Sequence, residues 1–150
     1  MAWQPRRELH AMTPAQRAAV VAEAYSWMGT PYIHMGRIKG VGVDCAQLLI
    51  LVNAAAGVIE NFDPGTYTHD WYMHRDEDLY LGHLLRYAQR TDDPQPGDIA
   101  GFKFGRTTSH AGIISEPGYM IHAYRPFGRV DRTEIRALDS RLSGYYTVRP

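Results

Sequence analysis

Cys45 stands where a cysteine can act as a nucleophile. It is the only cysteine in the 150 residues, and it follows Asp44 at the predicted start of an apolar helix. A helix N-terminus carries a partial positive charge and unpaired N–H groups, and both favour thiolate over thiol. Because the thiolate is the attacking species, this position prepares Cys45 for attack on a carbonyl carbon. The alternative is a small buried apolar residue, a common role of free cysteine.

Two of the seven histidines are candidates for the base that such a cysteine needs. His110 and His122 each lie in a predicted strand, twelve residues apart, with the Glu116-Pro117-Gly118 turn midway. Hairpin pairing would place them opposite or nearly opposite on one face, with Cβ atoms about 5 Å apart. His110 can then take the Cys45 proton while His122 fixes the tautomer of His110. The alternative is a pair of histidines with structural partners only.

Two helices are predicted before and at the cysteine. Thr13-Pro14-Ala15-Gln16 has the pattern of a capping box with proline at the first helical position. This helix is expected from about 14 to 28, with an inward face made of Ala18, Val21, Ala22, Tyr25 and Met28. The glycine-rich segment 31–43 is expected to be a loop. The second helix starts after Asp44, stops at Gly57 and is apolar enough to be buried on most sides.

Beyond residue 94 the hydrophobic period changes to two, which is typical of strands. Five strands are predicted, at about 98–104, 109–115, 119–124, 130–135 and 144–149. Residues 1–13 are interpreted as an N-terminal arm, and residues 61–93 as an insert with a helix at 76–87. Helices followed by strands indicate a single α+β domain over 1–150, with the helices packed on one face of an antiparallel sheet.

The composition argues against several classes of function. Sixteen Lys and Arg balance sixteen Asp and Glu, so no general positive field attracts nucleic acid or an anionic membrane, and neither partner is expected. No apolar run approaches the roughly 20 residues of a membrane span. The first residues lack the pattern of a secretory signal, and we therefore expect synthesis in the cytoplasm.

No metal or cofactor is expected either. One cysteine excludes a disulfide framework and any multi-thiolate metal site. The spacing of the other histidines fits no His-Glu-x-x-His pattern, and the glycines of 36–42 fit neither phosphate-loop pattern.

Several short segments follow one another in a specific order: Gly29-Thr30-Pro31-Tyr32, a glycine-rich loop, Val43-Asp44-Cys45, Gln95-Pro96-Gly97-Asp98-Ile99, Ser109-His110-Ala111-Gly112-Ile113-Ile114 and Ile121-His122-Ala123. Taken together, over about residues 14 to 149, they resemble the NlpC/P60 cysteine peptidases. This resemblance implies a papain-like NlpC/P60 fold, with the nucleophile at the start of a helix that packs on the sheet. It also implies roles for three residues: Cys45 as nucleophile, His110 as general base and then acid, and His122 as the orienting residue.

The resemblance implies further site residues. Tyr32 matches a family tyrosine whose hydroxyl lies near the oxyanion site. Asp44 and Ser109 adjoin the catalytic residues and could contact the polar ends of a peptide, with a helix cap and a polar strand residue as their structural alternatives. The sequence departs from the family pattern at Ile33-His34-Met35-Gly36, where paired glycines are more usual, and at Ala46, where serine is usual. The longer insert could cap the cleft.

The implied activity is that of a cysteine endopeptidase that cleaves an amide in peptidoglycan stem peptides, between γ-D-glutamyl and a diamino acid, through a thioester. The aromatic insert around 70–75 and the missing signal resemble stand-alone phage or prophage tail-associated peptidases. This implies carriage on a tail, with tail proteins as partners, or release by lysis. Two alternatives stay open: a tail assembly component with incidental or no hydrolase activity, and a papain-like amidase or acyltransferase acting on another acyl substrate.

Overall fold

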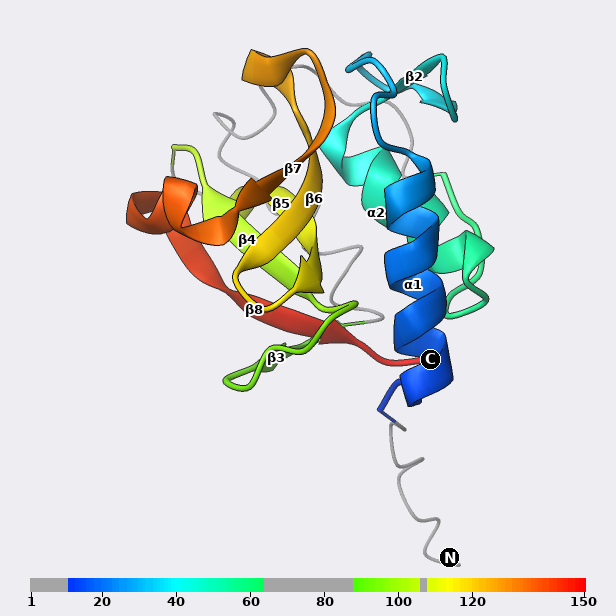
Figure 1. The fold of residues 1–150 in the computed structure, drawn as a ribbon, viewed down its shortest axis with the longest axis vertical. Helices are drawn as coiled ribbons and strands as arrows, with labels where there is room; N and C mark the ends of the chain where they lie inside the picture. The colour runs from blue at the N-terminus through cyan, green and yellow to red at the C-terminus, as the bar shows by residue number, and fades with distance from the viewer. Residues whose placement is uncertain (1–10, 64–87, 106–107) are drawn as a thin grey trace, which may run out of the picture.

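The computed structural model describes residues 11–63, 88–105 and 108–150, and its centre is an antiparallel sheet with two helices on one face (Figure 1). The sheet order is β3-β8-β4-β5-β6-β7. The helices are α1 (Pro14–Ser26) and α2 (Cys45–Ala55). The strands of the sheet are β3 (Ala88–Thr91), β4 (Ile99–Lys103), β5 (Thr108–Glu116), β6 (Tyr119–Tyr124), β7 (Arg129–Glu134) and β8 (Leu142–Val148). The α+β prediction is confirmed.

Helix α1 begins as predicted but buries a different face. Thr13 and Gln16 form the capping box reciprocally. The buried residues are Val20, Ala24 and Trp27, whereas the predicted inward face is largely exposed, with Tyr25 at 40% and Met28 at 39%. The prediction of that inward face was therefore wrong. In an alanine-rich helix both stripes have helical spacing, so spacing alone could not choose between them.

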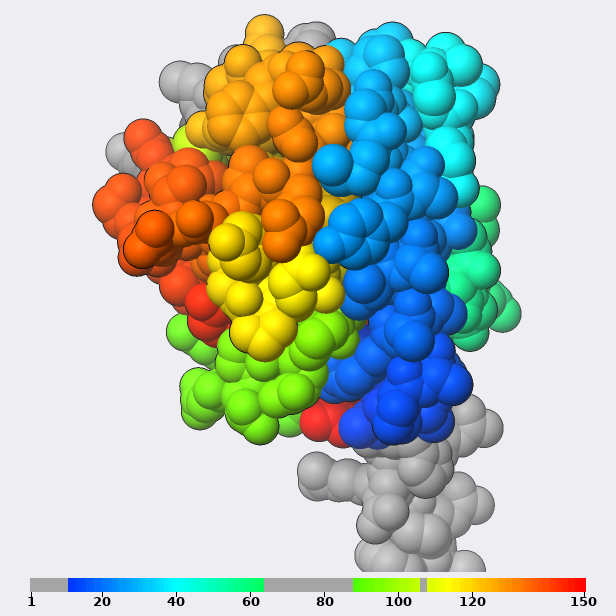
Figure 2. All heavy atoms as spheres, viewed as in Figure 1, coloured from blue at the N-terminus to red at the C-terminus, as the bar shows by residue number. Residues whose placement is uncertain are grey.

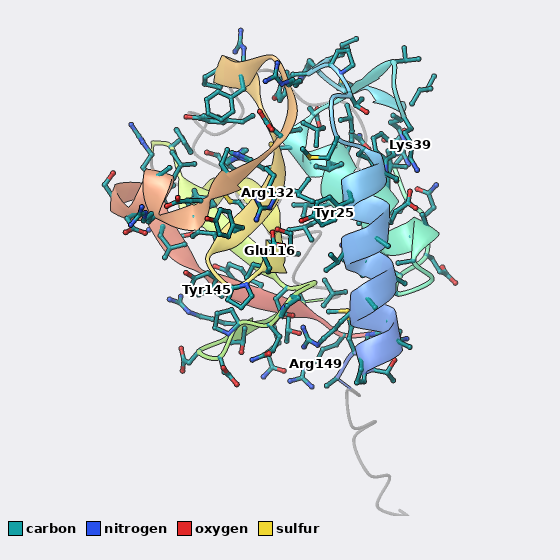
Figure 3. The ribbon with its side chains drawn as sticks, viewed as in Figure 1. Tyr25, Lys39, Glu116, Arg132, Tyr145 and Arg149 are labelled. Atoms are coloured by element: carbon teal, nitrogen blue, oxygen red, sulfur yellow. The ribbon has the colours of Figure 1, made fainter. Side chains whose placement is uncertain are left out.

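Polar contacts explain which stripe of α1 faces inward. Arg17 lies on the same side of α1 as the buried residues. Its Nη1 lies 2.8 Å from Oδ1 of the buried Asp98, which holds this side of the helix toward the core. On the outer side, the Tyr25 hydroxyl donates to the Glu116 carboxylate at 3.1 Å, and Arg132 binds the same carboxylate at 2.5 Å. Figure 3 shows these three side chains meeting between α1 and the strands. Polar pairing thus orients the helix about its axis.

The segment predicted as a loop contains a small hairpin, so that prediction is corrected. Strands β1 (Arg37–Ile38) and β2 (Gly42–Val43) pair antiparallel just before α2. A Cβ added at Gly36 would lie 2.5 Å from the carbonyl carbon of Gly42, so the backbones approach too closely for a side chain. The glycines therefore allow a compact hairpin that leads directly into Cys45.

Helix α2 matches its prediction closely. Asp44 caps it by accepting from the Gln47 N–H at 2.9 Å, and the helix stops at the C-cap Ala56. Its buried residues include Leu48, Leu49 and Val52, all with 0% exposure. The residue at its first position is thus held by a helix embedded in the core.

All five predicted strands are present, and the sheet has a sixth. Strand β3 lies in the region interpreted as an insert and pairs with β8 at the edge of the sheet. Its sequence Ala-Gln-Arg-Thr lacks the alternation that marks a strand, because an edge strand need not bury one face fully. The helix expected at 76–87 and the first ten residues of the expected arm lie outside the described residues.

Apolar residues cover both faces of the sheet. Ala111, Ile113, Ile121 and Ala123 share one core cluster with the buried residues of α1 and α2. The other face holds Ala100, Phe102, Ile114, Met120 and Ile135, the last from the 3₁₀ segment η3 (Ile135–Arg141). Figure 2 shows α1 lying at the surface directly beside β7. Among the described helices none is long and apolar enough to cross a membrane.

Candidate active site

The structure places Cys45 against the strand that carries His110. Cys45 is the first residue of α2, and its Sγ lies 3.9 Å from the carbonyl oxygen of Ser109. The side chain is 8% exposed. The apolar faces of α2 and β5 pack together in one core cluster, which fixes the helix start beside this strand.

His110 and His122 form a hydrogen-bonded pair. Nε2 of His110 lies 2.8 Å from Nδ1 of His122, and both side chains are buried. The register of β5 and β6 pairs Ile113 with Ile121, and its continuation sets Gly112 opposite His122. The two histidines are therefore diagonal neighbours on one face, close to the predicted arrangement.

Gly112 gives the His122 ring its place beside His110. A Cβ at Gly112 would lie 3.1 Å from Cβ of His122 and 2.9 Å from Sδ of Met120. Such a side chain would push the His122 ring away from β5. The role of this glycine depends on strand register, and the sequence prediction did not include it.

Thr133 on β7 extends the pair to a third hydrogen-bonding group. Its Oγ1 lies 2.9 Å from Nε2 of His122. β7 pairs His122 with Asp131, so Thr133 is two residues further along the same face. The sequence pattern did not predict a role for Thr133. The available signal was the register counted from the Pro126-Phe127-Gly128 turn.

Aromatic rings enclose the two histidines. Tyr124 stacks on His122 with ring centroids 5.1 Å apart, and Phe104 meets His110 edge-on at 5.8 Å. Phe127 meets the His122 ring at 6.2 Å. This apolar wall removes water from the imidazoles, and removal of water disfavours their charged forms.

Burial keeps both imidazoles neutral. It lowers the pKa of His110 well below its usual value, and the neighbouring His122 lowers it further. Burial likewise lowers the pKa of His122 to about 4, against a smaller opposing effect of the Asp131 carboxylate. The pair is therefore a neutral hydrogen-bonded unit at pH 7.

The thiol environment differs from the expectation. Burial raises the pKa of the Cys45 thiol far above its usual value, and the Asp44 carboxylate raises it further. The N–H groups of Ala46 and Cys45 act in the expected direction but are the smaller effects on this pKa. Desolvation thus outweighs the helix N-terminus, and the described site favours a neutral thiol.

Tyr32 lies where the loop before α2 meets the β6–β7 connection. Its N–H donates to the carbonyl of Gly128 at 2.8 Å, and it forms an isolated bridge with Val43. Burial raises the pKa of its hydroxyl, and charges on Cys45 and Asp44 raise it further. The hydroxyl accordingly stays protonated and can donate a hydrogen bond.

Asp44 and Ser109 make internal hydrogen bonds. Asp44 is 1% exposed, and its second oxygen accepts from the Met35 N–H at 2.7 Å in addition to the helix cap. Ser109 donates through Oγ to the carbonyl of Phe104 at 3.2 Å. These contacts support the structural alternatives, while substrate binding by either residue stays a prediction.

No group of three or more His, Cys, Asp or Glu side chains suited to a metal ion occurs within 11–63, 88–105 and 108–150. His34 does approach Asp44, at 3.9 Å, but this is a pair. The chemistry available in the described site is therefore that of a thiol, two imidazoles and hydrogen-bond donors.

Comparison with solved structures defines the fold. The NlpC/p60 domain of the peptidoglycan hydrolase SagA superposes with a TM-score of 0.61 and 23% identity over 87% of this chain and 97% of that one. NlpC2 from Trichomonas vaginalis gives 0.66 and 17% over 95% of this chain and 52% of that one. The peptidoglycan hydrolase RipB from Mycobacterium tuberculosis gives 0.57 and 20% over 98% and 73%.

The chain has the NlpC/P60 fold, as its sequence motifs predicted. It spans nearly all of the SagA domain but about half of NlpC2. No protein-family model matches the sequence, and a search of curated proteins finds no match.

Proposed function

We propose that this protein is a cysteine endopeptidase that cleaves an amide in peptidoglycan stem peptides. The observation that carries the proposal is the thiol of Cys45 at the start of α2, beside the strand that presents the His110–His122 pair. The similar folds of SagA and RipB, both described as peptidoglycan hydrolases, support the choice of substrate.

Acylation begins with a neutral thiol. His110 takes the proton of Cys45, so the S–H bond breaks and an N–H bond forms on the imidazole. The sulfur electron pair forms a bond to the substrate carbonyl carbon, and the carbonyl π electrons move to oxygen. His110 becomes an imidazolium that hydrogen bonds to His122.

Collapse of the tetrahedral adduct expels the amine. His110 returns its proton to the leaving nitrogen, and a thioester to Cys45 is left. Water then attacks the thioester with His110 as base, which releases the acid and restores the thiol. The aromatic wall around the histidines keeps bulk water from the proton path.

Two kinds of donor can stabilise the oxyanion. The α2 N-terminus supplies backbone N–H groups, and Tyr32 supplies a protonated hydroxyl from the adjoining loop. One such donor contributes about 3 to 4 kcal/mol in other acyl-transfer enzymes. The variant Tyr32→Phe keeps the aromatic ring and removes only this hydrogen-bond donor to the oxyanion.

The bond that we propose lies between γ-D-glutamyl and the diamino acid, and the proposal for this bond is based on the family resemblance. The test uses purified peptidoglycan of several chemotypes with wild-type protein and Cys45→Ala, and mass spectrometry of the soluble products. The expected result is release of peptides with a free diamino-acid amine by wild type alone.

Failure to release peptides from any wall, with folded protein and reduced Cys45, would overturn the proposal. Assays on lipid amides and other acyl peptides then distinguish an amidase or acyltransferase from a protein that only docks. Release by both wild type and Cys45→Ala would identify a contaminating hydrolase.

We also propose that the protein is made in the cytoplasm and reaches the wall on a phage tail or through lysis. The support is the resemblance of the 70–75 insert, which lies outside the described residues, to tail-associated peptidases. Mass spectrometry of purified particles tests this proposal: presence with the tail proteins supports carriage, and absence excludes it.

A further inference from the structure

We propose that Thr133 is a positioning residue whose hydroxyl accepts a hydrogen bond from Nε2–H of His122 and thereby sets the tautomers of both histidines. The geometry is a continuous line from His110 through His122 to Oγ1 of Thr133, with contacts of 2.8 and 2.9 Å. Its consequence for catalysis rests on the proposed function, but the tautomers themselves do not.

Each neutral imidazole carries one ring proton, so the direction of one hydrogen bond dictates the next. If Thr133 accepts from Nε2–H of His122, then Nδ1 of His122 is an acceptor. The bond between the rings then requires the proton of His110 on Nε2. This leaves Nδ1 of His110 as the nitrogen that can accept the Cys45 proton.

The reverse direction is unproductive. If Thr133 donated to Nε2, then Nδ1–H of His122 would donate to Nε2 of His110. The single proton of His110 would then occupy Nδ1, and no ring nitrogen would be left to act as base. The direction of the Thr133 hydrogen bond therefore decides whether His110 is competent.

The protonated state favours the same direction. When His110 becomes an imidazolium, both of its nitrogens are donors, so Nδ1 of His122 must accept. With Thr133 as acceptor, this arrangement exists before and after proton transfer, and no hydrogen bond has to reverse. Asp131, opposite His122 in the strand register, adds a negative charge that favours the cationic pair.

Burial makes the hydrogen bond necessary. His122 is 1% exposed, and Tyr124 stacks on its ring, so the described surroundings of Nε2 provide Thr133 as its hydrogen-bond partner in place of bulk water. A buried N–H without an acceptor is costlier than a bare ring nitrogen. Removal of the hydroxyl should therefore shift the His122 proton to Nδ1.

The test compares Thr133→Val with Thr133→Ser. Valine keeps the shape and the strand preference of threonine, and serine keeps the hydroxyl. Thr91→Val is the matched control, because Thr91 lies on β3 at the opposite edge of the sheet. Two-bond ¹H–¹⁵N spectra of histidine-labelled protein report the tautomer of each ring.

We expect Nε2–H at both His110 and His122 in wild type, Thr133→Ser and Thr91→Val. In Thr133→Val we expect Nδ1–H to gain population at His122 and His110. The value of kcat on peptidoglycan should fall about 10- to 100-fold with little change in KM, the range known for hydrogen-bond partners that orient metal-bound histidines. Should Thr133→Val not fold, Thr133→Ala takes its place.

Unchanged tautomers in folded Thr133→Val would overturn the proposal, as would Nδ1–H at both rings in the wild type. A tautomer change in a protein that cleaves no wall would leave the positioning role intact and remove only the proposed function. Loss of activity with unchanged tautomers would mean that Thr133 is merely structural.

Discussion

Two largely buried polar clusters in this protein compensate the loss of hydration in different ways. Near the start of α1, Arg17 meets Asp98 at 2.8 Å, and the second Asp98 oxygen accepts from the Gln95 N–H at 2.8 Å. On β5 and β6, His110 and His122 face each other among aromatic rings, and within the described residues no carboxylate hydrogen bonds to either ring. The first cluster is an ion pair, whereas the second stays neutral.

The difference shows what each cluster can do. A buried charge is tolerated when an opposite charge and further hydrogen bonds compensate its desolvation, and the result is a fixed contact. Neutral imidazoles in a hydrogen-bonded line retain the ability to take and pass on a proton. Burial alone does not mark a functional site, whereas strongly shifted pKa values of titratable side chains gather at such sites more often than elsewhere.

The largest expected effect is the loss of activity when His110 is removed from the neutral histidine cluster. His110→Ala removes the general base, so cleavage of peptidoglycan should fall about 10²- to 10⁴-fold. Product release by mass spectrometry measures this. Thr91→Val, which changes a residue on β3 at the opposite edge of the sheet, should keep activity near that of wild type. Comparable losses in both variants would contradict a specific role for His110.

Breaking the ionic cluster should affect stability instead. Arg17→Met leaves Asp98 buried and unpaired, and the free energy of unfolding should fall by about 3 kcal/mol. Urea denaturation measures it. Arg90→Met, an exposed arginine on β3, should change stability by less than about 0.5 kcal/mol. Arg17→Met with Asp98→Asn should recover part of the loss, and failure to recover would argue against the ion pair as the cause.

The pH dependence of stability sharpens the comparison. The pKa of His122 is about 4 in the folded protein and about 6.5 when unfolded, so the unfolded chain binds more protons in acid. Stability is complete above pH 6.5 and should fall by roughly 3 kcal/mol by pH 4 from this residue. His122→Gln should flatten the curve in this window. An NMR titration midpoint of His122 near 6.5 would contradict the prediction.

The smallest effect concerns the thiol. Because burial raises the pKa of Cys45, iodoacetamide should modify the folded protein more slowly at pH 7 than the urea-unfolded chain. The ratio of the two rates should change with pH between 7 and 10. If poor access of iodoacetamide to the thiol were the only cause, the alkylation rate of the folded protein would be reduced by the same factor at every pH. A plateau of fast alkylation in the folded protein at pH 6 would indicate a thiolate and contradict the prediction of a neutral thiol.

The sequence predicted the positions of the candidate site residues better than the packing contacts between the elements that carry them. Cys45 was placed at a helix start by Asp44 and the apolar run after it, and the two histidines were placed on a hairpin by the turn between them. These are local signals, since capping and turns depend on a few neighbouring residues. The burial of α2 followed in the same way from its continuous apolar sequence.

Apart from the short β1–β2 hairpin, the features missed by the sequence depend on contacts between distant segments. Spacing within α1 allowed two inward faces, and the choice came from Arg17 with Asp98 and from Tyr25 with Glu116. The expected thiolate also depended on a local argument, the helix N-terminus, and desolvation by the packed domain outweighs it.

The sequence by itself determined the order of elements, the caps and turns, and the residue types that can do chemistry, because short-range geometry encodes them. Only the tertiary structure decided the protonation of these residues and the partner of His122. Protonation depends on how much water the fold removes, and Thr133 reaches the ring because β7 pairs with β6 in one register.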